Sequence, residues 1–396
     1  MILVKRSKCQ KVKKSKRDLG IAGETGKMTL GVKIERVSPI TLKATRGYDE
    51  WVIVRILTDQ GIEGIGEGFT WRGQASTIRS HIETIAQQIT GTNPLAIEAF
   101  LKRFLFSQAT DRNWCAAISA IEIALWDIVG KMADLPIYTL LGGPVHKEIP
   151  LYADHGIFDG AESWEEQVER ILRAKEAGFK MFKWDPFEGE GTPDAKELGK
   201  QVDRVNQVRE AVGKDYPLAI DAHNRFSVDG AIMAARVLEP LNINFFEAPT
   251  KDDPEMLRKV ADATSIPLAT GELTTTRRGA KALLDSGVIK VFQPEVGTNG
   301  GILESCKTGD LAELYDVKIA IHNWCGPVVT RAATQVCART PNLLYQEYAG
   351  GAPKNDWEHE LLDPPTQIEN GHLILPDGPG LGFKLNEKLL ASRVID

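Results

Sequence analysis

The second half of the sequence repeats one simple unit, a short apolar run followed by a longer amphipathic stretch of helical period. The eight apolar runs are IPLYA, KMFKWD, PLAID, INFFE, IPLAT, KVFQP, KIAIH and LLYQE. Short apolar runs that alternate with amphipathic helices indicate buried parallel strands joined by crossover helices. Eight such units predict an α/β protein whose parallel strands close into a barrel.

Polar residues end six consecutive apolar runs, at spacings of 23 to 27 residues. They are Asp221, Glu247, Glu272, Glu295, His322 and Glu347. The carboxyl ends of barrel strands meet at one face, and that face holds the active site in proteins of this architecture. Six polar ends in succession, five of them acidic, are hard to explain as solvated strand ends. We therefore expect these side chains to surround one pocket.

Three of the acids, Asp221, Glu247 and Glu272, follow three adjacent predicted strands. Carboxylates that are crowded together repel one another and raise each other's pKa unless a cation neutralises them. Oxygen ligands favour a hard cation, so the sequence predicts a Mg²⁺ site. The alternative is that each acid pairs with a basic side chain, but the flanking segments FFEAP and ATGEL contain no Lys or Arg.

Imidazole and ammonium groups accompany the predicted metal site. In the run LAIDAHNRF, His223 lies two residues after Asp221, and side chains two residues apart share one face of a strand. His322 ends the seventh run, and Glu295 before it is a candidate to orient and tune the ring. Together with Lys183, these groups suit the abstraction of a proton next to a carboxylate. The sequence has no glycine-rich phosphate loop.

Ahead of the barrel, the sequence predicts an α+β domain over residues 28–150. Three strand-like runs, VKIERVSPITLKA, EWVIVRILTDQG and IEGIGEGF, break at glycine as in an antiparallel meander. Two segments of helical period follow, QASTIRSHIETIAQQIT and NWCAAISAIEIALWDIVGKMADLP. We assign the barrel to residues 151–354 and a C-terminal segment to residues 355–396.

Residues 1–27 differ from the rest because positions 1–20 hold eight Lys or Arg residues against one acid. A basic tail can bind nucleic acid, but most such tails are solvated, so we expect a disordered extension before a folded part that opens at Met28. The apolar start is too short for a secretory signal. Deleting residues 1–27 should leave activity intact.

The composition of the 396-residue chain argues against several classes of partner. The net charge is −6, with 42% hydrophobic and 26% charged residues, so we expect neither a nucleic-acid nor a membrane partner. No apolar run approaches the ~20 residues that a membrane span needs. The five cysteines show no CxxC spacing, which indicates free thiols in the reducing cytoplasm.

Several motifs together resemble the enolase superfamily, in particular its mandelate racemase subgroup. The resemblance extends from about residue 30 to the C-terminus. Its motifs are AIEIALWDIVGKMADLPIYTLLGG, FKWDPF, AIDAHNRF, FFEAP, ATGE, QPEVGTNGGI, IHN and YQE. It implies a (β/α)7β barrel, a modified TIM barrel, with an N-terminal α+β capping domain and a C-terminal segment that returns to the cap. Members of the family commonly form homo-oligomers.

Within the subgroup, KWDPF, the D-x-H-x-R-F pattern and HN most resemble sugar-acid dehydratases of the gluconate and galactonate type. The resemblance implies a Mg²⁺-dependent elimination that converts an aldonate or aldarate to a 2-keto-3-deoxy acid. Its implied metal ligands are Asp221, Glu247 and Glu272, the same three acids that the spacing singles out.

The resemblance also implies a role for each of the other polar residues. His322 would abstract the C2 proton, and His223 would protonate the departing C3 hydroxyl. Lys183 would bind the substrate carboxylate and stabilise the enediolate, while Glu347 would bind the enediolate or a hydroxyl. For Arg225 two roles stay open, a contact with the substrate and a local ion pair.

Four positions depart from the subgroup pattern: Asp185, Glu295, Asn224 and Ala248. Asp185 stands where many members have the second lysine of a Lys-x-Lys pair, which weakens a racemase assignment. It is a candidate weak base, hydroxyl-binding group or structural acid. Glu295 replaces the usual Asp partner of His322. Two alternatives to a dehydratase remain: an epimerase, racemase or lactone cycloisomerase that uses the same enediolate, and a catalytically silent homologue.

Two predicted cap loops, residues 44–51 and 69–74, are candidates for setting substrate specificity. They contain Arg46, Tyr48, Trp71 and Arg72. Arginine pairs with carboxylates through two hydrogen bonds, so these loops would allow an aldaric acid as well as an aldonic one. The alternative is that these four residues belong to the cap surface. Trp324, shortly after the seventh run, is a further candidate for the pocket.

Overall fold

The computed structural model describes most of the chain. The described residues are 31–44, 50–106, 111–158, 161–187, 189, 191–348 and 357–395. The predicted basic extension and the loop residues Arg46 and Tyr48 lie outside these ranges. Within these ranges, no helix is both long and apolar enough to cross a membrane.

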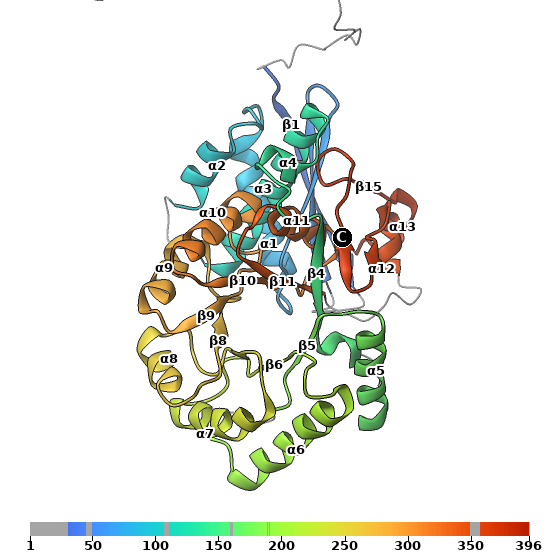
Figure 1. Cartoon of the computed structure of the whole chain (residues 1–396). Helices are drawn as coiled ribbons and strands as arrows, with labels where there is room; N and C mark the ends of the chain where they lie inside the picture. The colour runs from blue at the N-terminus through green and yellow to red at the C-terminus, as the bar shows by residue number, and fades with distance from the viewer. Residues whose placement is uncertain are drawn as a thin grey trace, which may run out of the picture. The chain divides into compact units, whose positions relative to one another are not determined.

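Eight parallel strands in the described part form a closed barrel, which confirms the prediction from the eight apolar runs (Figure 1). They are β4 (Glu148–Ala153), β5 (Met181–Trp184), β6 (Leu218–Asp221), β7 (Phe246–Glu247), β8 (Leu268–Thr270), β9 (Ile289–Phe292), β10 (Lys318–Ile321) and β11 (Leu343–Tyr348). Each strand pairs with the next in the chain. The ring closes where β11 pairs with β4, with Glu347 opposite Tyr152.

One helix follows each of the first seven barrel strands, and these helices lie around the outside of the barrel (Figure 1). They are α5 (Trp164–Glu176), α6 (Ala195–Val212), α7 (Val228–Leu238), α8 (Pro254–Ala261), α9 (Thr276–Ser286), α10 (Gly301–Leu314) and α11 (Pro327–Arg339). Side-chain caps fix where several begin: Asp194 accepts from two N–H groups of α6, and Ser227 accepts from Gly230 of α7. This alternation confirms the (β/α)7β form.

An antiparallel sheet and three helices precede the barrel and form the cap, which confirms the predicted α+β cap and adds one helix, α2, that was not predicted. They are β1 (Ile34–Lys43), β2 (Glu50–Thr58), β3 (Glu63–Gly68), α1 (Ala75–Ile89), α2 (Ile97–Phe104) and α3 (Arg112–Ala133); the short α4 (Ile137–Leu140) leads to the barrel. Alternate glycines of β3 let α3 lie directly against the sheet. A Cβ at Gly64 or Gly66 would come within 2.1 or 1.9 Å of the main-chain oxygens of Ala124 and Ala120.

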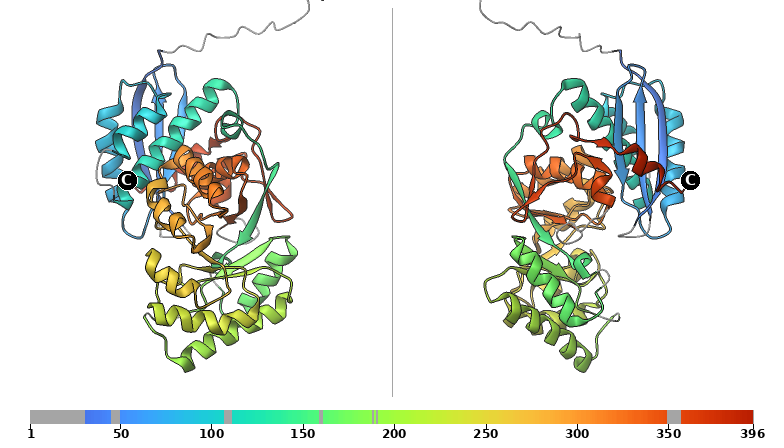
Figure 2. Two further views of the ribbon diagram at one scale, coloured as in Figure 1. Left: turned by 60° about the vertical axis from the view of Figure 1, so that its left-hand side comes forward. Right: turned by 90° about the vertical axis from the view of Figure 1, so that its right-hand side faces the viewer.

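The C-terminal segment contacts both the barrel and the cap, and its end runs beside the cap sheet (Figure 2). Its elements are α12 (Trp357–Glu360), β12 (Leu362–Asp363), β13 (Ile368–Glu369), β14 (His372–Ile374), β15 (Lys384–Leu385) and α13 (Glu387–Ala391). Strand β14 pairs antiparallel with β4. Near the end, Lys43 N donates to Arg393 O at 2.9 Å and Ile395 N donates to Thr41 O at 3.1 Å.

Two buried acids of the cap accept hydrogen bonds from the starts of two barrel helices. Glu67 of β3 accepts from the N–H groups of Gly326 at 2.6 Å and Val329 at 3.0 Å, at the start of α11. Glu122 of α3 accepts from Ile302 N at 2.7 Å, at the start of α10. The first N–H groups of a helix have no partner within the helix, so these hydrogen bonds join the cap to the helices that follow β9 and β10.

Candidate active site

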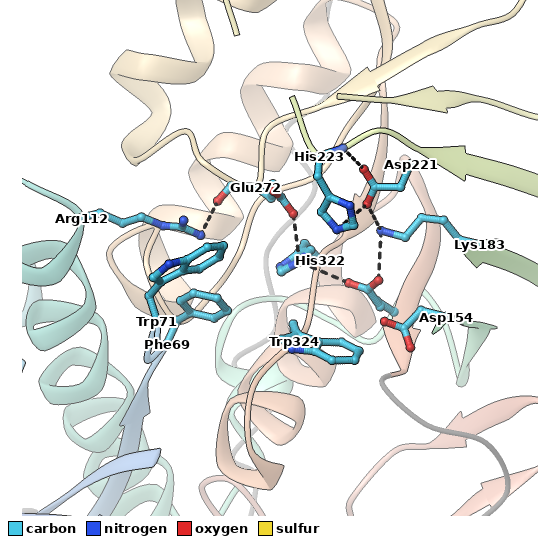
Figure 3. Close-up of a pocket in the computed structure, with 11 residues that line it drawn as sticks. Phe69, Trp71, Arg112, Asp154, Lys183, Asp221, His223, Glu272, His322 and Trp324 are labelled. Carbon is cyan, nitrogen blue, oxygen red and sulfur yellow. Dashed lines mark hydrogen bonds and ion pairs between the residues drawn. The ribbon is translucent and has the colours of Figure 1, made fainter. Parts of the chain in front are cut away.

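A pocket lies at the carboxyl ends of the barrel strands, with residues of the cap on one side (Figure 3). It is lined by Phe69, Trp71, Arg112, Asp154, Lys183, Asp221, His223, Glu272, His322, Trp324 and Glu347. It encloses about 430 Å³, part of it open to solvent. Only about 50 Å³ of this space admits a water-sized sphere. Sites for small molecules typically hold ~300–1,000 Å³, so side chains of the pocket must move to admit a ligand larger than a few water molecules.

Strand register brings the predicted residues together. Lys183 lies on β5, and Asp221 and Glu247 end β6 and β7, where they are direct partners in the sheet. Glu347 lies on β11, the strand that closes the ring by pairing with β4. The others follow their strands within three residues: Glu272 after β8, Glu295 after β9 and His322 after β10.

Lys183 is buried and makes ion pairs with three carboxylates. Its Nζ lies 2.9 Å from Glu247, 3.1 Å from Glu347 and 3.5 Å from Asp221. Burial opposes its charge, but Glu247 and Glu347 outweigh burial and raise the pKa of Lys183 well above its ordinary value. For Glu347, burial acts in the opposite direction, yet Lys183 and His322 lower its pKa to about 2. The pocket therefore holds a permanent ammonium charge.

Asp221, Glu247 and Glu272 form a donor set whose chemistry suits a hard cation. Burial first, and then repulsion from Asp221, raise the pKa of Glu247 to about 8 despite Lys183, which is the mark of crowded carboxylates. Their oxygens here contact Lys183 and His322, and no group of three or more His, Cys, Asp or Glu side chains in the described ranges is arranged to hold a metal ion. Binding a cation therefore requires these carboxylates to turn.

His322 is buried and is held at both ring nitrogens by carboxylates. Its Nδ1 lies 2.8 Å from Glu295 Oε2, and its Nε2 lies 3.1 Å from Glu272 Oε2. Gly297 N donates to the other oxygen of Glu295 at 2.8 Å, which fixes that carboxylate. Burial opposes the imidazolium form, but Glu347 and Glu272 outweigh it and raise the pKa of His322 well above its ordinary value.

His223 forms a second carboxylate–histidine contact. Its Nδ1 lies 2.7 Å from Asp185 Oδ2, and its Nε2 lies 3.4 Å from Asp221 Oδ2. Arg225 also pairs with Asp185, and its Nε donates to Ala222 O at 3.1 Å. The charge of Asp221 is the largest influence on His223 and, together with Asp185, it outweighs burial and raises the pKa of His223 to about 9. Arg225 thus makes the local ion pair, one of its two predicted roles.

The two carboxylate–histidine pairs follow one design. In each pair the carboxylate comes from the strand before the histidine: Asp185 follows β5 and His223 follows β6, while Glu295 follows β9 and His322 follows β10. The pairs are four strands apart in a ring of eight, and therefore lie on opposite sides of the barrel mouth. In each ring Nδ1 meets this carboxylate, and Nε2 faces an acid that lines the pocket, Glu272 for His322 and Asp221 for His223.

The remaining predicted residues differ in where they lie. Trp71 and Trp324 line the pocket, whereas Arg72 is exposed and does not line it. Two lining residues were missed by the sequence analysis, Arg112 at the start of α3 and Asp154 at the end of the first barrel strand. Asp154 directly follows the apolar run IPLYA, so the strand-end pattern could have found it. Nothing in the sequence marks Arg112.

Two family descriptions match the chain. "Mandelate racemase / muconate lactonizing enzyme, N-terminal domain" matches residues 27–142, and "Enolase C-terminal domain-like" matches residues 165–389. Together these matches span the cap, most of the barrel and most of the C-terminal segment.

Similar proteins of known name and structure cover nearly the whole chain. A D-xylonate dehydratase of Haloferax volcanii is 30% identical over 92% of this chain and 90% of its own. A D-gluconate dehydratase of Thermoproteus tenax is 30% identical over 90% of this chain and 73% of its own. The crystal structure of a mandelate racemase/muconate lactonizing enzyme from Sulfitobacter sp. superposes with a TM-score of 0.84 at 30% identity, covering 92% of this chain and 96% of the other.

Proposed function

The chain belongs to the mandelate racemase/muconate lactonizing enzyme family of the enolase superfamily, and we propose that it dehydrates an acid sugar to a 2-keto-3-deoxy acid. One observation carries this proposal: a second imidazole, His223, reaches the pocket opposite His322. Elimination of water needs a base for the C2 proton and an acid for the C3 hydroxyl. The dehydratases of D-xylonate and D-gluconate among the relatives support the same class of lyase.

The contacts of the two histidines support the role that we propose for each. His322 takes the C2 proton at Nε2 in its neutral form, once Glu272 has turned away from that nitrogen, because Glu295 holds Nδ1. The electrons of the C2–H bond form a C2–C3 double bond as the C3–O bond breaks, and His223 gives its Nε2 proton to the leaving oxygen to form water. Asp185 orients that ring through Nδ1. The enol product then gains a proton at C3 and becomes the 2-keto acid.

Charged residues around the histidines would hold the substrate carboxylate and the metal ion. Lys183 binds the carboxylate next to C2, and Glu347 positions the lysine at 3.1 Å. Asp221, Glu247 and Glu272 would hold Mg²⁺, which members of the superfamily generally use. When bound, the cation supplies positive charge beside the substrate carboxylate, which favours loss of the neighbouring proton.

The proposal is tested by a screen of aldonic and aldaric acids with Mg²⁺, in which 2-keto acids are trapped with semicarbazide. We expect at least one acid to give a 2-keto-3-deoxy product that is lighter than the substrate by one water. The control is the His322→Asn protein under the same conditions. A library-wide absence of keto acid with a folded, Mg²⁺-binding protein would contradict dehydration.

A second function, epimerisation at C2, is favoured by the position of the two carboxylate–histidine pairs on opposite sides of the barrel mouth. Bases on the two faces of C2 can remove and return a proton with inversion. Epimerisation, like lactone cycloisomerisation, leaves the mass of the substrate unchanged. Proton exchange at C2 in deuterated water without a keto product would establish this class in place of dehydration.

A further inference from the structure

Arg112, the first residue of the cap helix α3, lines the pocket, and the mechanism above does not use it. Its guanidinium lies over the rings of Phe69 and Trp71, with 4.9 and 5.3 Å from the guanidinium carbon to the ring centroids. A terminal nitrogen donates to the main-chain oxygen of Glu272 at 3.3 Å. Two rings and one carbonyl therefore fix the plane of the guanidinium before a ligand arrives.

The positive charge of Arg112 is not matched by an acid. Within the described ranges it forms no ion pair, and its buried Nε has no acceptor. Burial raises the pKa of Asp252, and the charge of Arg112 opposes that rise. The Asp252 carboxylate, however, is hydrogen-bonded to Thr270 and Thr274. A buried donor without an acceptor costs free energy, so a ligand that brings an acceptor to the guanidinium would be favoured.

The place of Arg112 in the pocket indicates which part of the substrate it meets. Figure 3 shows Arg112 with Phe69 and Trp71 on one side, and Lys183 with Asp221 on the other. A substrate whose first carboxylate lies at Lys183 points its far end toward the cap. A planar guanidinium stacked on aromatic rings binds a planar carboxylate through two hydrogen bonds, a geometry that a single hydroxyl cannot match.

We propose that Arg112 is a specificity-determining residue that binds a second, distal carboxylate, so that the enzyme prefers an aldarate to the matching aldonate. This inference rests on the proposed dehydration and names the substrate class for it. It also assigns to Arg112 the role that the sequence suggested for Arg46 or Arg72. Of these three arginines, Arg46 lies outside the described ranges and Arg72 is exposed outside the pocket lining.

The test compares acids that differ only at the far end, such as D-gluconate with D-glucarate and D-galactonate with galactarate. We expect kcat/KM of the wild-type protein to be higher for the aldarate of the active pair. In Arg112→Met the ratio of aldarate to aldonate kcat/KM should fall by ~10- to 100-fold, the effect of losing charge-assisted hydrogen bonds. Arg112→Lys keeps the charge without the planar fork and should fall between the two.

Three results would overturn the inference. They are a wild-type preference for the aldonate, an Arg112→Met protein in which both substrates lose the same factor, and a collapse of the ratio in Arg72→Met instead. Mg²⁺ affinity and thermal melting of each variant separate the loss of a substrate contact from a disturbance of the neighbouring Glu272. If Arg112→Met does not fold, Arg112→Lys decides by the same ratio.

A binding measurement keeps this inference distinct from the proposed function. If no acid is dehydrated, the reaction assigned above is wrong, and calorimetric titration of the Mg²⁺-loaded protein with each acid then decides the inference alone. Tighter binding of the dicarboxylate that is lost in Arg112→Met supports a distal carboxylate site. Equal affinities for the two acids contradict it.

Discussion

Each histidine of the pocket contacts a carboxylate that does not itself line the pocket. Glu295 meets Nδ1 of His322, and Asp185 meets Nδ1 of His223. A carboxylate at one nitrogen fixes the tautomer and the ring plane, so that proton transfer takes place at the other nitrogen. In the proposed dehydration, the same arrangement would therefore serve a base on one side and an acid on the other.

Replacing His322 by Asn should stop the reaction at its first step. Asn keeps a polar side chain but cannot take a proton, so turnover and exchange of the C2 proton should both fall by ~10³-fold or more. Melting temperature and Mg²⁺ affinity should stay close to those of the wild-type protein. Exchange of the C2 proton in deuterated water, read by NMR, checks this. Near-normal exchange would remove His322 from the role of base.

Replacing Asp185 by Asn should separate the two proton transfers. Asn cannot hold the Nδ1 proton of His223 as a carboxylate does, so dehydration should fall ~10- to 100-fold. Exchange at C2 depends on His322 and should persist. The control is Asp203→Asn, a change at an exposed position of α6. If exchange falls together with dehydration, Asp185 supports the whole site rather than His223.

Residues at strand ends could be predicted from the sequence, and contacts across the fold could not. Asp221 and Glu247 are direct sheet partners because the apolar runs fix strand type and the barrel fixes the end that matters. Asp154 obeys the same rule but was missed, since the first units are longer than the later repeat of 23 to 27 residues. Arg112 reaches the pocket only because α3 packs against β3, and no spacing in the sequence encodes that approach.

At the scale of elements, the cap and barrel are joined by buried acids. Glu67 and Glu122 sit at the starts of α11 and α10, the helices that follow the strands bearing His322 and Glu295. The sequence showed the glycine-rich strand IEGIGEGF and predicted its place in the cap sheet. The sequence did not indicate that Glu67 in this strand accepts hydrogen bonds from the start of a helix more than 250 residues away. This contact exists only once both domains have folded.

The stability of the cap–barrel contact should depend on pH through Glu67. Burial, against three backbone N–H bonds, raises the pKa of Glu67 from 4.5 to about 8. Between these values the unfolded chain binds fewer protons at this group than the folded protein, so stability falls as pH rises from about 4.5 to about 8 and is then constant. Glu67→Gln is neutral at every pH and lacks this decline.

Melting temperatures of the two proteins from about pH 5 to about pH 9 test this dependence. The wild-type protein should lose stability relative to Glu67→Gln across the window, by an amount on the order of a few kcal/mol. Other titrating groups are shared by both proteins and cancel in the difference. A difference that does not change with pH would show that Glu67 is ionised in the folded protein at all these values.

At the scale of the whole molecule, the site is complete only when cap and barrel are both present. The barrel provides the acids, the histidines and Lys183, and the cap provides Phe69, Trp71 and Arg112. The C-terminal segment pairs with β4 and with the cap sheet. Ligands of the pocket should therefore stabilise the assembly as a whole, since they bind the folded chain and not the unfolded one.

Mg²⁺ should raise the melting temperature of the whole chain, and Glu247→Gln should remove most of that rise. Free ion at ~100 times its Kd adds ~2.7 kcal/mol to the stability of the folded state. The variant loses one carboxylate ligand. It also loses a buried acid whose ionisation is disfavoured, since burial and Asp221 raise the pKa of Glu247 to about 8. Without metal it should therefore melt at about the wild-type temperature or above it, while Lys183 keeps Asp221 and Glu347 as partners.

The melting temperatures of the wild-type protein and of Glu247→Gln should therefore cross as Mg²⁺ is added. Without metal, burial and the neighbouring Asp221 and Glu272 disfavour the charge of Glu247. With metal, that charge becomes an advantage. Thermal melts over a Mg²⁺ series, each repeated with a chelator, measure both limits. Equal rises in the two proteins would mean that Glu247 does not bind the ion, and the ligand set would then have to be sought among the other acids of the pocket, Asp154 and Glu347.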